Sequence, residues 1–127
     1  MKKFNALIVD DNEVFRQSLQ RILARHFPFM LVSQAGDGDD ALNSVAKRIP
    51  DLIFMDIRMP GKSGLDIIRI IKNVDTHPMI CVITSFDLPE YRDAAFHSGA
   101  DHFIIKDEST ETAIVSIVAD MLSGLSA

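Results

Sequence analysis

The feature that most constrains the fold of this chain is the alternation of short apolar runs with amphipathic helical patterns. Each apolar run has the length of a strand and is bounded by turn-forming or charged residues. The runs cover residues 6–9, 30–32, 52–55, 79–83 and 103–105. Because they are almost continuously apolar, we expect strands that are covered on both faces, as in a parallel sheet.

A helical pattern follows each of the five runs, with apolar residues recurring every three or four positions. Asp37 is predicted to cap the second helix and Ser109 the last one, and Gly99 is predicted to end the fourth. Five strand–helix units predict one α/β domain over residues 1–127, with right-handed crossovers.

Polar residues stand where four of the predicted strands end. Asp10 and Asp11 follow the first strand, Asp56 the third, Thr84 the fourth and Lys106 the fifth. Since the carboxyl ends of parallel strands share one edge, where such sheets carry their functional crevice, we expect these groups to converge.

Three converging carboxylates repel one another, and a hard divalent cation such as Mg²⁺ relieves that repulsion. One carboxylate is then free to act as a nucleophile toward phosphorus, while Lys106 and Thr84 stabilise charge on the transferred group. Each residue alone also has a simpler interpretation, as a helix start, a turn or a surface charge. The interpretation therefore rests on all of them together.

The remaining composition excludes other classes. A net charge of −5 argues against a nucleic-acid surface on this chain, and no apolar stretch approaches the length of a membrane span. The single cysteine, Cys81, lies in an apolar run and is read as a small buried hydrophobe in a reducing, cytoplasmic setting.

Four segments carry a resemblance to the receiver domain of two-component response regulators. They are residues 7–11, 51–61 with Gly64 beyond, 83–85 and 99–106. The match covers essentially the whole chain. It implies a doubly wound, flavodoxin-like α/β fold with one five-stranded parallel sheet in the order 2-1-3-4-5 and five helices on both faces.

The resemblance also implies the chemistry of the site. Asp56 is then the phosphoacceptor, and Mg²⁺, with Mn²⁺ as a substitute, is bound by Asp10, Asp11, Asp56 and the backbone carbonyl of Arg58. The phosphodonor is a sensor histidine kinase or a phosphotransfer protein. The resemblance therefore implies a signalling switch that catalyses only its own phosphorylation and dephosphorylation. It does not imply an enzyme that acts on other substrates.

The same resemblance assigns the phosphoryl contacts to Thr84 and Lys106 and the switch to Thr84 and Phe103, whose ring turns inward on phosphorylation. Asp107 replaces the proline, in a cis peptide, that many family members carry after the lysine. Lys-Asp at this point is similar to the branch with a C-terminal helix-turn-helix DNA-binding domain. In that case an output domain outside this chain binds DNA, and phosphorylation controls either homodimerisation or release.

Several alternatives stay open at this stage. The chain stops at Ala127, shortly after the last predicted helix, which favours a fragment over a stand-alone regulator or phosphorelay intermediate. A phosphohydrolase with an aspartyl nucleophile usually has a second acid two residues on, where this chain has Arg58. A degenerate receiver, used only as a binding module, would lack one of the pocket acids or the lysine. A flavodoxin-like cofactor binder would not need the three acids and the lysine.

Two further hypotheses concern residues around the pocket. Arg58 and Phe86 each follow a pocket residue by two positions, and we expect them to tune the lifetime of the acyl phosphate, in a direction that the sequence does not give. Of the first residues of helix one, Phe15 has core spacing to Leu19, whereas Val14 is the candidate for an exposed contact with a kinase.

Overall fold

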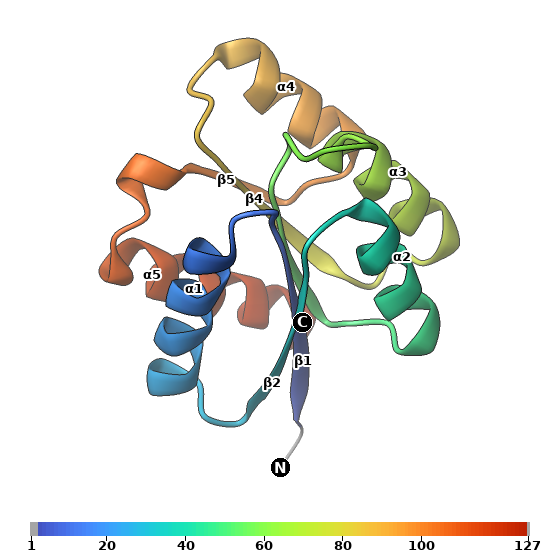
Figure 1. The fold of residues 1–127 in the computed structure, drawn as a ribbon. Helices are drawn as coiled ribbons and strands as arrows, with labels where there is room; N and C mark the ends of the chain where they lie inside the picture. The colour runs from blue at the N-terminus through green and yellow to red at the C-terminus, as the bar shows by residue number, and fades with distance from the viewer. Residues whose placement is uncertain (1–2, 127) are drawn as a thin grey trace.

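A computed structural model describes residues 3–126 and shows a central sheet with helices packed on both sides (Figure 1). Strands and helices alternate along the chain, as predicted, with one added 3₁₀ turn, η1, after the fifth strand. Their bounds are β1 (Phe4–Val9), α1 (Glu13–His26), β2 (Met30–Ala35), α2 (Gly38–Lys47), β3 (Leu52–Met55), α3 (Gly64–Val74), β4 (Met79–Thr84), α4 (Pro89–Ser98), β5 (His102–Ile105), η1 (Lys106–Glu108) and α5 (Glu111–Ser126).

The five strands form one parallel sheet in the order β2-β1-β3-β4-β5, which confirms the expected doubly wound fold. The second strand is longer than predicted and reaches Ala35 instead of residue 32. It lies at an edge of the sheet and alternates between buried and exposed positions, so the polar Ser33 and Gln34 remain part of the ladder. The length of an apolar run therefore underestimates the length of an edge strand.

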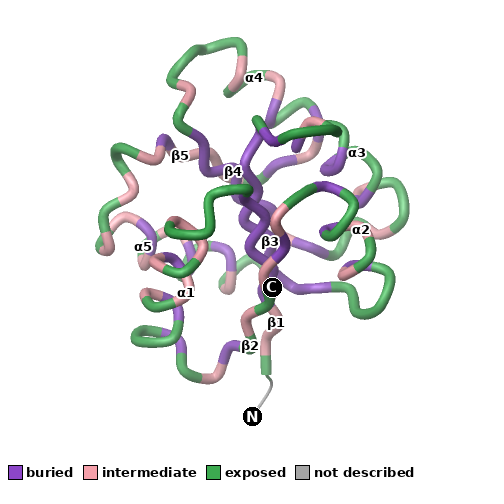
Figure 2. Tube along the Cα trace, in the orientation of Figure 1, coloured by how far each residue is buried: buried purple, intermediate pink, exposed green. Residues whose placement is uncertain are grey.

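Two apolar cores lie on opposite faces of the sheet. Helices α2, α3 and α4 cover one face, and α1 and α5 cover the other (Figure 1). Buried backbone follows the strands and the inner sides of the helices (Figure 2). Cys81 belongs to the second core and is fully buried, which confirms its interpretation as a hydrophobe. Burial raises the pKa of its thiol to about 12.

The helix ends follow local side-chain chemistry. The Asp37 carboxylate accepts a hydrogen bond from the backbone N–H of Asp40 and caps α2, as predicted, and Gly99 ends α4 with a φ of 122°. The predicted cap of the last helix is wrong. The Thr110 hydroxyl accepts the bond from the N–H of Ala113, whereas the Ser109 hydroxyl donates to the carbonyl of Lys106.

The last helix also extends further than the sequence indicated. It continues to Ser126, while Ala127 lies outside the described residues. No helix in the described part of the chain combines the length and the apolar character that a bilayer crossing requires. The backbone of residues 3–126 contains no cis peptide bond, in line with Asp107 standing where many receivers have proline.

Candidate functional site: an acidic pocket at the carboxyl ends of the strands

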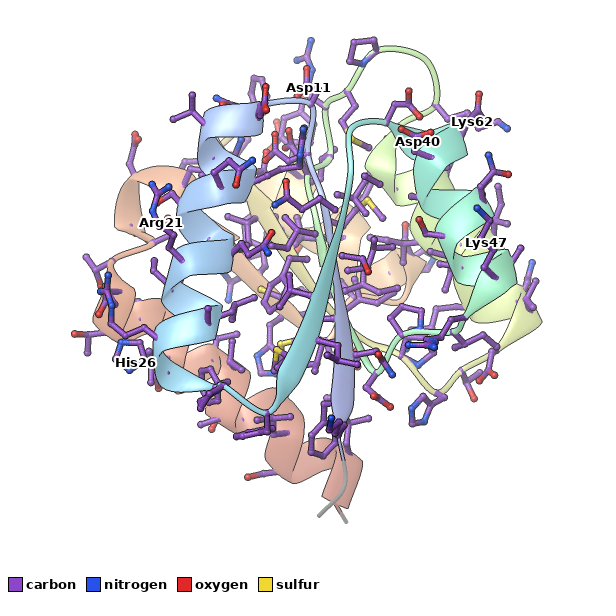
Figure 3. All side chains as sticks on the ribbon, turned by 60° about the horizontal axis from the view of Figure 1, so that its bottom comes forward. Asp11, Arg21, His26, Asp40, Lys47 and Lys62 are labelled. Carbon is purple, nitrogen blue, oxygen red and sulfur yellow. The ribbon has the colours of Figure 1, made fainter. Side chains whose placement is uncertain are left out.

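The predicted acidic residues converge at one edge of the sheet. One carboxylate oxygen from each of Asp10, Asp11 and Asp56 lies within 4.8 Å of the others. Asp10 and Asp56 are buried and Asp11 is exposed, so the group opens to solvent on the Asp11 side. Asp11 lies at the end of the molecule where α1 begins, and His26 lies at the far end of that helix (Figure 3).

Parallel pairing fixes the backbone beneath this cluster. The backbone N–H of Asp10 donates to the carbonyl of Ala35 on β2, and that of Asp56 donates to the carbonyl of Val9 on β1. The hydrogen-bond ladder therefore continues one residue past the ends of the strands. Asp10 and Asp56 follow directly after the paired residues Val9 and Met55, so the two aspartates lie side by side. The N–H of Asn12 donates to the Asp10 carboxylate at 2.9 Å, which orients that side chain.

Lys106 is the cation of the pocket. Its Nζ lies 2.7 Å from Oδ2 of Asp10 and 3.8 Å from Oδ2 of Asp56, and its side chain is only 16% exposed. Three carboxylates and one ammonium leave a negative site. Its carboxylate oxygens are the type of ligand that a hard divalent cation such as Mg²⁺ prefers, and its solvent-exposed side leaves room for such an ion to enter.

Burial raises the pKa of Asp56 to about 6, from an ordinary 3.8. The charge of Asp10 adds to the rise, the Lys106 ammonium opposes it, Asp11 raises it slightly, and a hydrogen bond with the Arg58 backbone lowers it. At neutral pH the carboxylate is therefore mostly ionised while it is more basic than an ordinary aspartate. Both properties suit a nucleophile.

Thr84 and Phe103 lie on β4 and β5 and are not members of the acidic cluster. Thr84 is fully buried at the end of β4, paired in register with Ile105, and its hydroxyl accepts a hydrogen bond from the N–H of Phe86. Phe103 is half-buried on β5 and packs against the core beneath α3 and α4. The Arg92 guanidinium lies 5.6 Å from the centre of its ring. Phe103 also lines a surface hollow together with Leu88 and Arg92 at the start of α4.

Several neighbours of the pocket were not singled out for it from the sequence. Arg16 Nη1 donates to the backbone carbonyl of Asp10 at 2.6 Å, and its Nε donates to Oε1 of Gln34. Phe15, assigned to core packing, does pack against the core, and its ring also lies 4.5 Å from Nζ of Lys106. Gly64 belonged to the recognised motif without a stated role. A Cβ there would overlap the carbonyl oxygen of Asp56.

Other charged and titratable side chains lie away from the acidic pocket. His26 and Arg25 contact Glu111 at the exposed junction of α1 and α5, and these two contacts lower the pKa of that glutamate. His77 pairs with Asp51 at 2.8 Å, near the amino ends of the strands. Asp37 caps α2, and Asp40 and Lys62 lie near one another at this end of the molecule (Figure 3).

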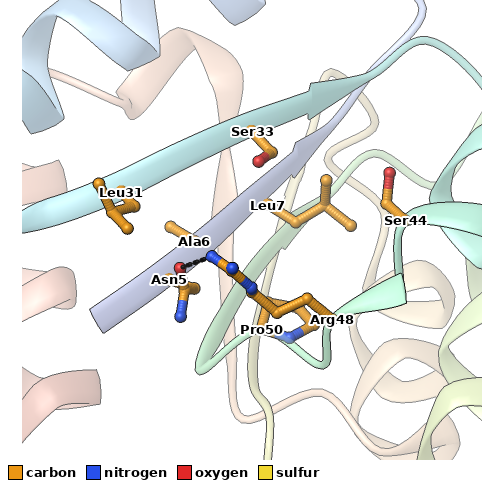
Figure 4. A pocket seen from close by; sticks show the side chains of 8 residues that line it. All are labelled: Asn5, Ala6, Leu7, Leu31, Ser33, Ser44, Arg48 and Pro50. Carbon is orange, nitrogen blue, oxygen red and sulfur yellow. Dashed lines mark hydrogen bonds between the residues drawn. The ribbon is translucent and has the colours of Figure 1, made fainter. Parts of the chain in front are cut away.

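A second hollow lies over the start of β1, between β2 and the end of α2 (Figure 4). Arg48 crosses it and donates from Nη1 to Oδ1 of Asn5 at 3.3 Å. Its other lining residues are apolar groups, a proline and two serines. The residues that line it include no carboxylate to bind a cation and no histidine to activate a serine, so this hollow lacks the chemistry of the acidic pocket.

The fold and the site together define a class: a doubly wound α/β domain with three aspartates and a lysine at the carboxyl ends of its strands. The profile of the response regulator receiver domain matches residues 6–118, so the chain belongs to the response regulator receiver domain family. The resemblance seen in the sequence is thereby confirmed.

Relatives of known name fit this assignment. The chain is 31% identical over 123 residues to the transcriptional regulatory protein NarL of Mycobacterium tuberculosis, in an alignment covering 97% of this chain and 56% of that protein. It is 31% identical over 117 residues to the transcriptional regulatory protein DesR of Bacillus subtilis, covering 92% of this chain and 57% of DesR. The chain thus spans about half the length of the curated relatives it matches.

Solved structures agree in fold. The signal receiver domain of the M. tuberculosis NarL superposes with a TM-score of 0.89 at 30% identity, covering 98% of this chain and 99% of that one. A CheY-like receiver domain from Methanospirillum hungatei reaches a TM-score of 0.91 at 19% identity, covering 98% of each chain. The second likeness speaks for the fold alone.

Proposed function

We propose that this receiver domain accepts a phosphoryl group on Asp56 from the phosphohistidine of a sensor histidine kinase or a phosphotransfer protein, and switches conformation as a result. The observation that carries the proposal is the convergence of Asp10, Asp11 and Asp56, with Lys106 within 4 Å of two of them. Family membership supports the signalling role. The proposal places the chain in the cytoplasm, with its donor.

The roles follow from the positions of the side chains. A carboxylate oxygen of Asp56 attacks phosphorus, the phosphorus–nitrogen bond of the donor breaks, and its electron pair stays on the imidazole. Asp10, Asp11, Asp56 and the Arg58 backbone carbonyl would hold Mg²⁺, with Mn²⁺ as a substitute, which supplies positive charge to the phosphoryl oxygens.

Two other side chains would meet the transferred group. Lys106 already lies between two of the carboxylates and is placed to contact a phosphoryl oxygen on Asp56. Thr84, at the end of the next strand, would exchange its contact with the Phe86 N–H for the phosphoryl group. The vacated space then favours an inward position of the Phe103 ring, which alters the surface at α4 and β5.

The arrangement disfavours the rival phosphohydrolase. Such an enzyme usually has a second acid two residues after the nucleophile, which protonates the leaving group. The position two residues after Asp56 carries Arg58, whose guanidinium stacks on Phe86. A degenerate receiver is disfavoured as well, since the pocket contains all three acids and the lysine.

We extend the proposal to the output and the partners. The named relatives are transcriptional regulatory proteins, and the alignments cover only 56% and 57% of their length. We therefore propose that phosphorylation controls transcription through a DNA-binding domain outside this chain, with homodimerisation as one route. Val14, 78% exposed on the first turn of α1 beside the pocket, is a candidate contact for the phosphodonor.

The direct test is incubation with Mg²⁺ and acetyl phosphate, followed by intact-mass measurement. We expect one added phosphoryl group on the wild type and none on Asp56→Asn. Beryllofluoride, which mimics the acyl phosphate, should likewise change the amide spectrum of the wild type alone. Asp39→Asn, which makes the same change in the first turn of α2, is the control and should be labelled normally. Labelling that persists in Asp56→Asn would place the phosphate elsewhere and refute the proposal.

A further inference from the structure

The ammonium of Lys106 has three neighbours, and one of them is not a carboxylate. Besides Asp10 and Asp56, the face of the Phe15 ring lies 4.5 Å from Nζ, measured to the ring centre. This distance is within the range in which a cation is attracted by the quadrupole of an aromatic ring. Because Lys106 is largely shielded from water, the attraction is stronger than at an exposed site.

Phe15 is firmly placed for this contact. Its backbone N–H donates to the Asn12 side chain that caps α1, at 3.1 Å. The next residue, Arg16, donates to the backbone carbonyl of Asp10. The ring packs against the core under α1 and α5 and borders the same small crevice as Asp10 and Asp56. The turn that carries the ring is therefore tied to the loop that carries the acids.

The ring differs from the carboxylates in one physical respect. Asp10 and Asp56 must serve other partners when a cation and a phosphoryl group enter the pocket, and their attraction for Lys106 then falls. Phe15 has no charge to neutralise and no oxygen to offer as a ligand, so its attraction for the ammonium is unchanged. Lysine has a flexible stem, and a second fixed attraction limits the positions its head can take.

We propose that Phe15 is a positioning residue for Lys106: its ring holds the ammonium at the pocket while Asp10 and Asp56 change partners. The inference rests on the proposed function and adds a residue that acts through Lys106. Phe15→Leu keeps an apolar side chain of similar size and removes the ring, whereas Phe15→Tyr keeps the ring face.

The contact itself is tested by NMR of the metal-free protein. Protons above an aromatic ring are shifted upfield, so the ε-methylene protons of Lys106 should lie upfield of the other lysines. We expect Phe15→Leu to abolish this shift and Phe15→Tyr to keep it. Phe29→Leu removes a ring at the opposite end of the sheet and should leave the shift unchanged. An unshifted Lys106 in the wild type would overturn the proposal.

The consequence is tested by the rate of labelling with acetyl phosphate and Mg²⁺. We expect Phe15→Leu to lower the limiting rate constant roughly fivefold, with recovery in Phe15→Tyr. In a Lys106→Met background, Phe15→Leu should cause no further loss, because the ring acts through the lysine. A loss of equal size in that background would indicate a merely structural role and overturn the proposal.

The two measurements separate the inference from the proposed function. If wild-type protein is labelled at Asp56 and Phe15→Leu is labelled equally fast, the inference fails while the function stands. If the wild type is not labelled at all, the function fails, and the NMR shift still decides whether the ring holds the lysine. Thermal unfolding of each variant identifies any loss of labelling rate that follows from misfolding. If Phe15→Leu is misfolded, the labelling rate of Phe15→Tyr decides whether the ring face is required.

Discussion

The guanidinium of Arg58 lies over the ring of Phe86, 4.6 Å from its centre. This contact joins the loop after β3 to the loop after β4, two residues beyond Asp56 and two beyond Thr84. Phe86 in turn packs against Tyr91 on α4, with ring centres 5.6 Å apart. The two residues that the sequence singled out separately are thus one unit at the rim of the pocket.

We predict that this unit slows hydrolysis of the acyl phosphate, because stacked side chains at the rim restrict the approach of water. Arg58→Ala and Phe86→Ala should each shorten the lifetime roughly two- to fivefold, from the strength of a partly exposed cation–π contact. The measurement is the decay of phosphorylated protein after removal of acetyl phosphate. Arg21→Ala, on the exposed side of α1, should leave the decay unchanged.

The double variant tests whether the two residues act together. If the stack is the active unit, Arg58→Ala adds little once Phe86 is already replaced. Rate effects that multiply in the double variant, or lifetimes equal to that of the wild type, would show that the contact does not control water access.

The raised pKa of Asp56 predicts a pH-dependent cost to stability in metal-free protein. Between its ordinary value of 3.8 and about 6, the folded protein binds more protons at Asp56 than the unfolded chain does. Its contribution is therefore fully present below the lower value and is lost as the pH rises through about 6. Asp56→Asn has no carboxyl group at this position and lacks this loss. Between pH 4 and 7 its free energy of unfolding should therefore rise relative to that of the wild type by on the order of 1 kcal/mol, after allowance for solvent screening.

The check is urea unfolding of both proteins in EDTA at several pH values. Other groups titrate in this range, so the relevant quantity is the difference between the two free energies of unfolding. A difference that stays constant from pH 4 to 7 would contradict the raised pKa.

Mg²⁺ should stabilise the folded protein, because the acidic cluster exists only when the strands are assembled. At a concentration ten times the dissociation constant, the gain is about 1.4 kcal/mol. We expect the thermal midpoint of the wild type to rise with Mg²⁺, and that of Asp11→Asn to rise much less. Asp39→Asn removes a nearby acid outside the cluster and should respond as the wild type does. An equal response of Asp11→Asn would exclude Asp11 as a ligand.

Gly64 is predicted to tolerate no side chain. A Cβ there would overlap the carbonyl oxygen of Asp56, and the Gly64 N–H donates to the carbonyl of Ile57 at 2.8 Å, so backbone lies against backbone. Gly64→Ala should destabilise the fold by about 2–4 kcal/mol. It should also weaken Mg²⁺ binding, because the Asp56 backbone must move to relieve the overlap with the new Cβ. Gly36→Ala meets only ordinary contact with Arg16 and is the control in urea unfolding. Equal stability of the two variants would contradict the prediction.

The strand ends were readable from the sequence because β1, β3 and β5 each finish in an apolar run that is followed directly by a charged residue. Topology then brings Asp10, Asp56 and Lys106 together. Side-chain contacts between loops were less accessible. The ring of Phe15 has the spacing of a core residue, and nothing in that spacing reveals which cation lies over its face.

The error at the start of α5 has a similar origin. Ser109 and Thr110 are adjacent hydroxyl residues, and both residue types are favoured as helix caps. The choice between them depends on η1, because the carbonyl of its first residue, Lys106, accepts a hydrogen bond from the Ser109 hydroxyl and leaves Thr110 to cap the helix. Sequence pattern does not predict such a turn, because its residues, Lys106–Glu108, are also ordinary loop residues.

The parallel order of the sheet has a consequence for the newly made chain. Every strand is joined to the next strand along the chain through a helix, so no pair of pocket residues meets in a local hairpin. Asp10 is synthesised near the start, and the strand that delivers its partner Lys106 emerges near the end. The pocket is therefore complete only when almost the whole domain has left the ribosome, and a nascent chain cannot receive a signal before it has folded.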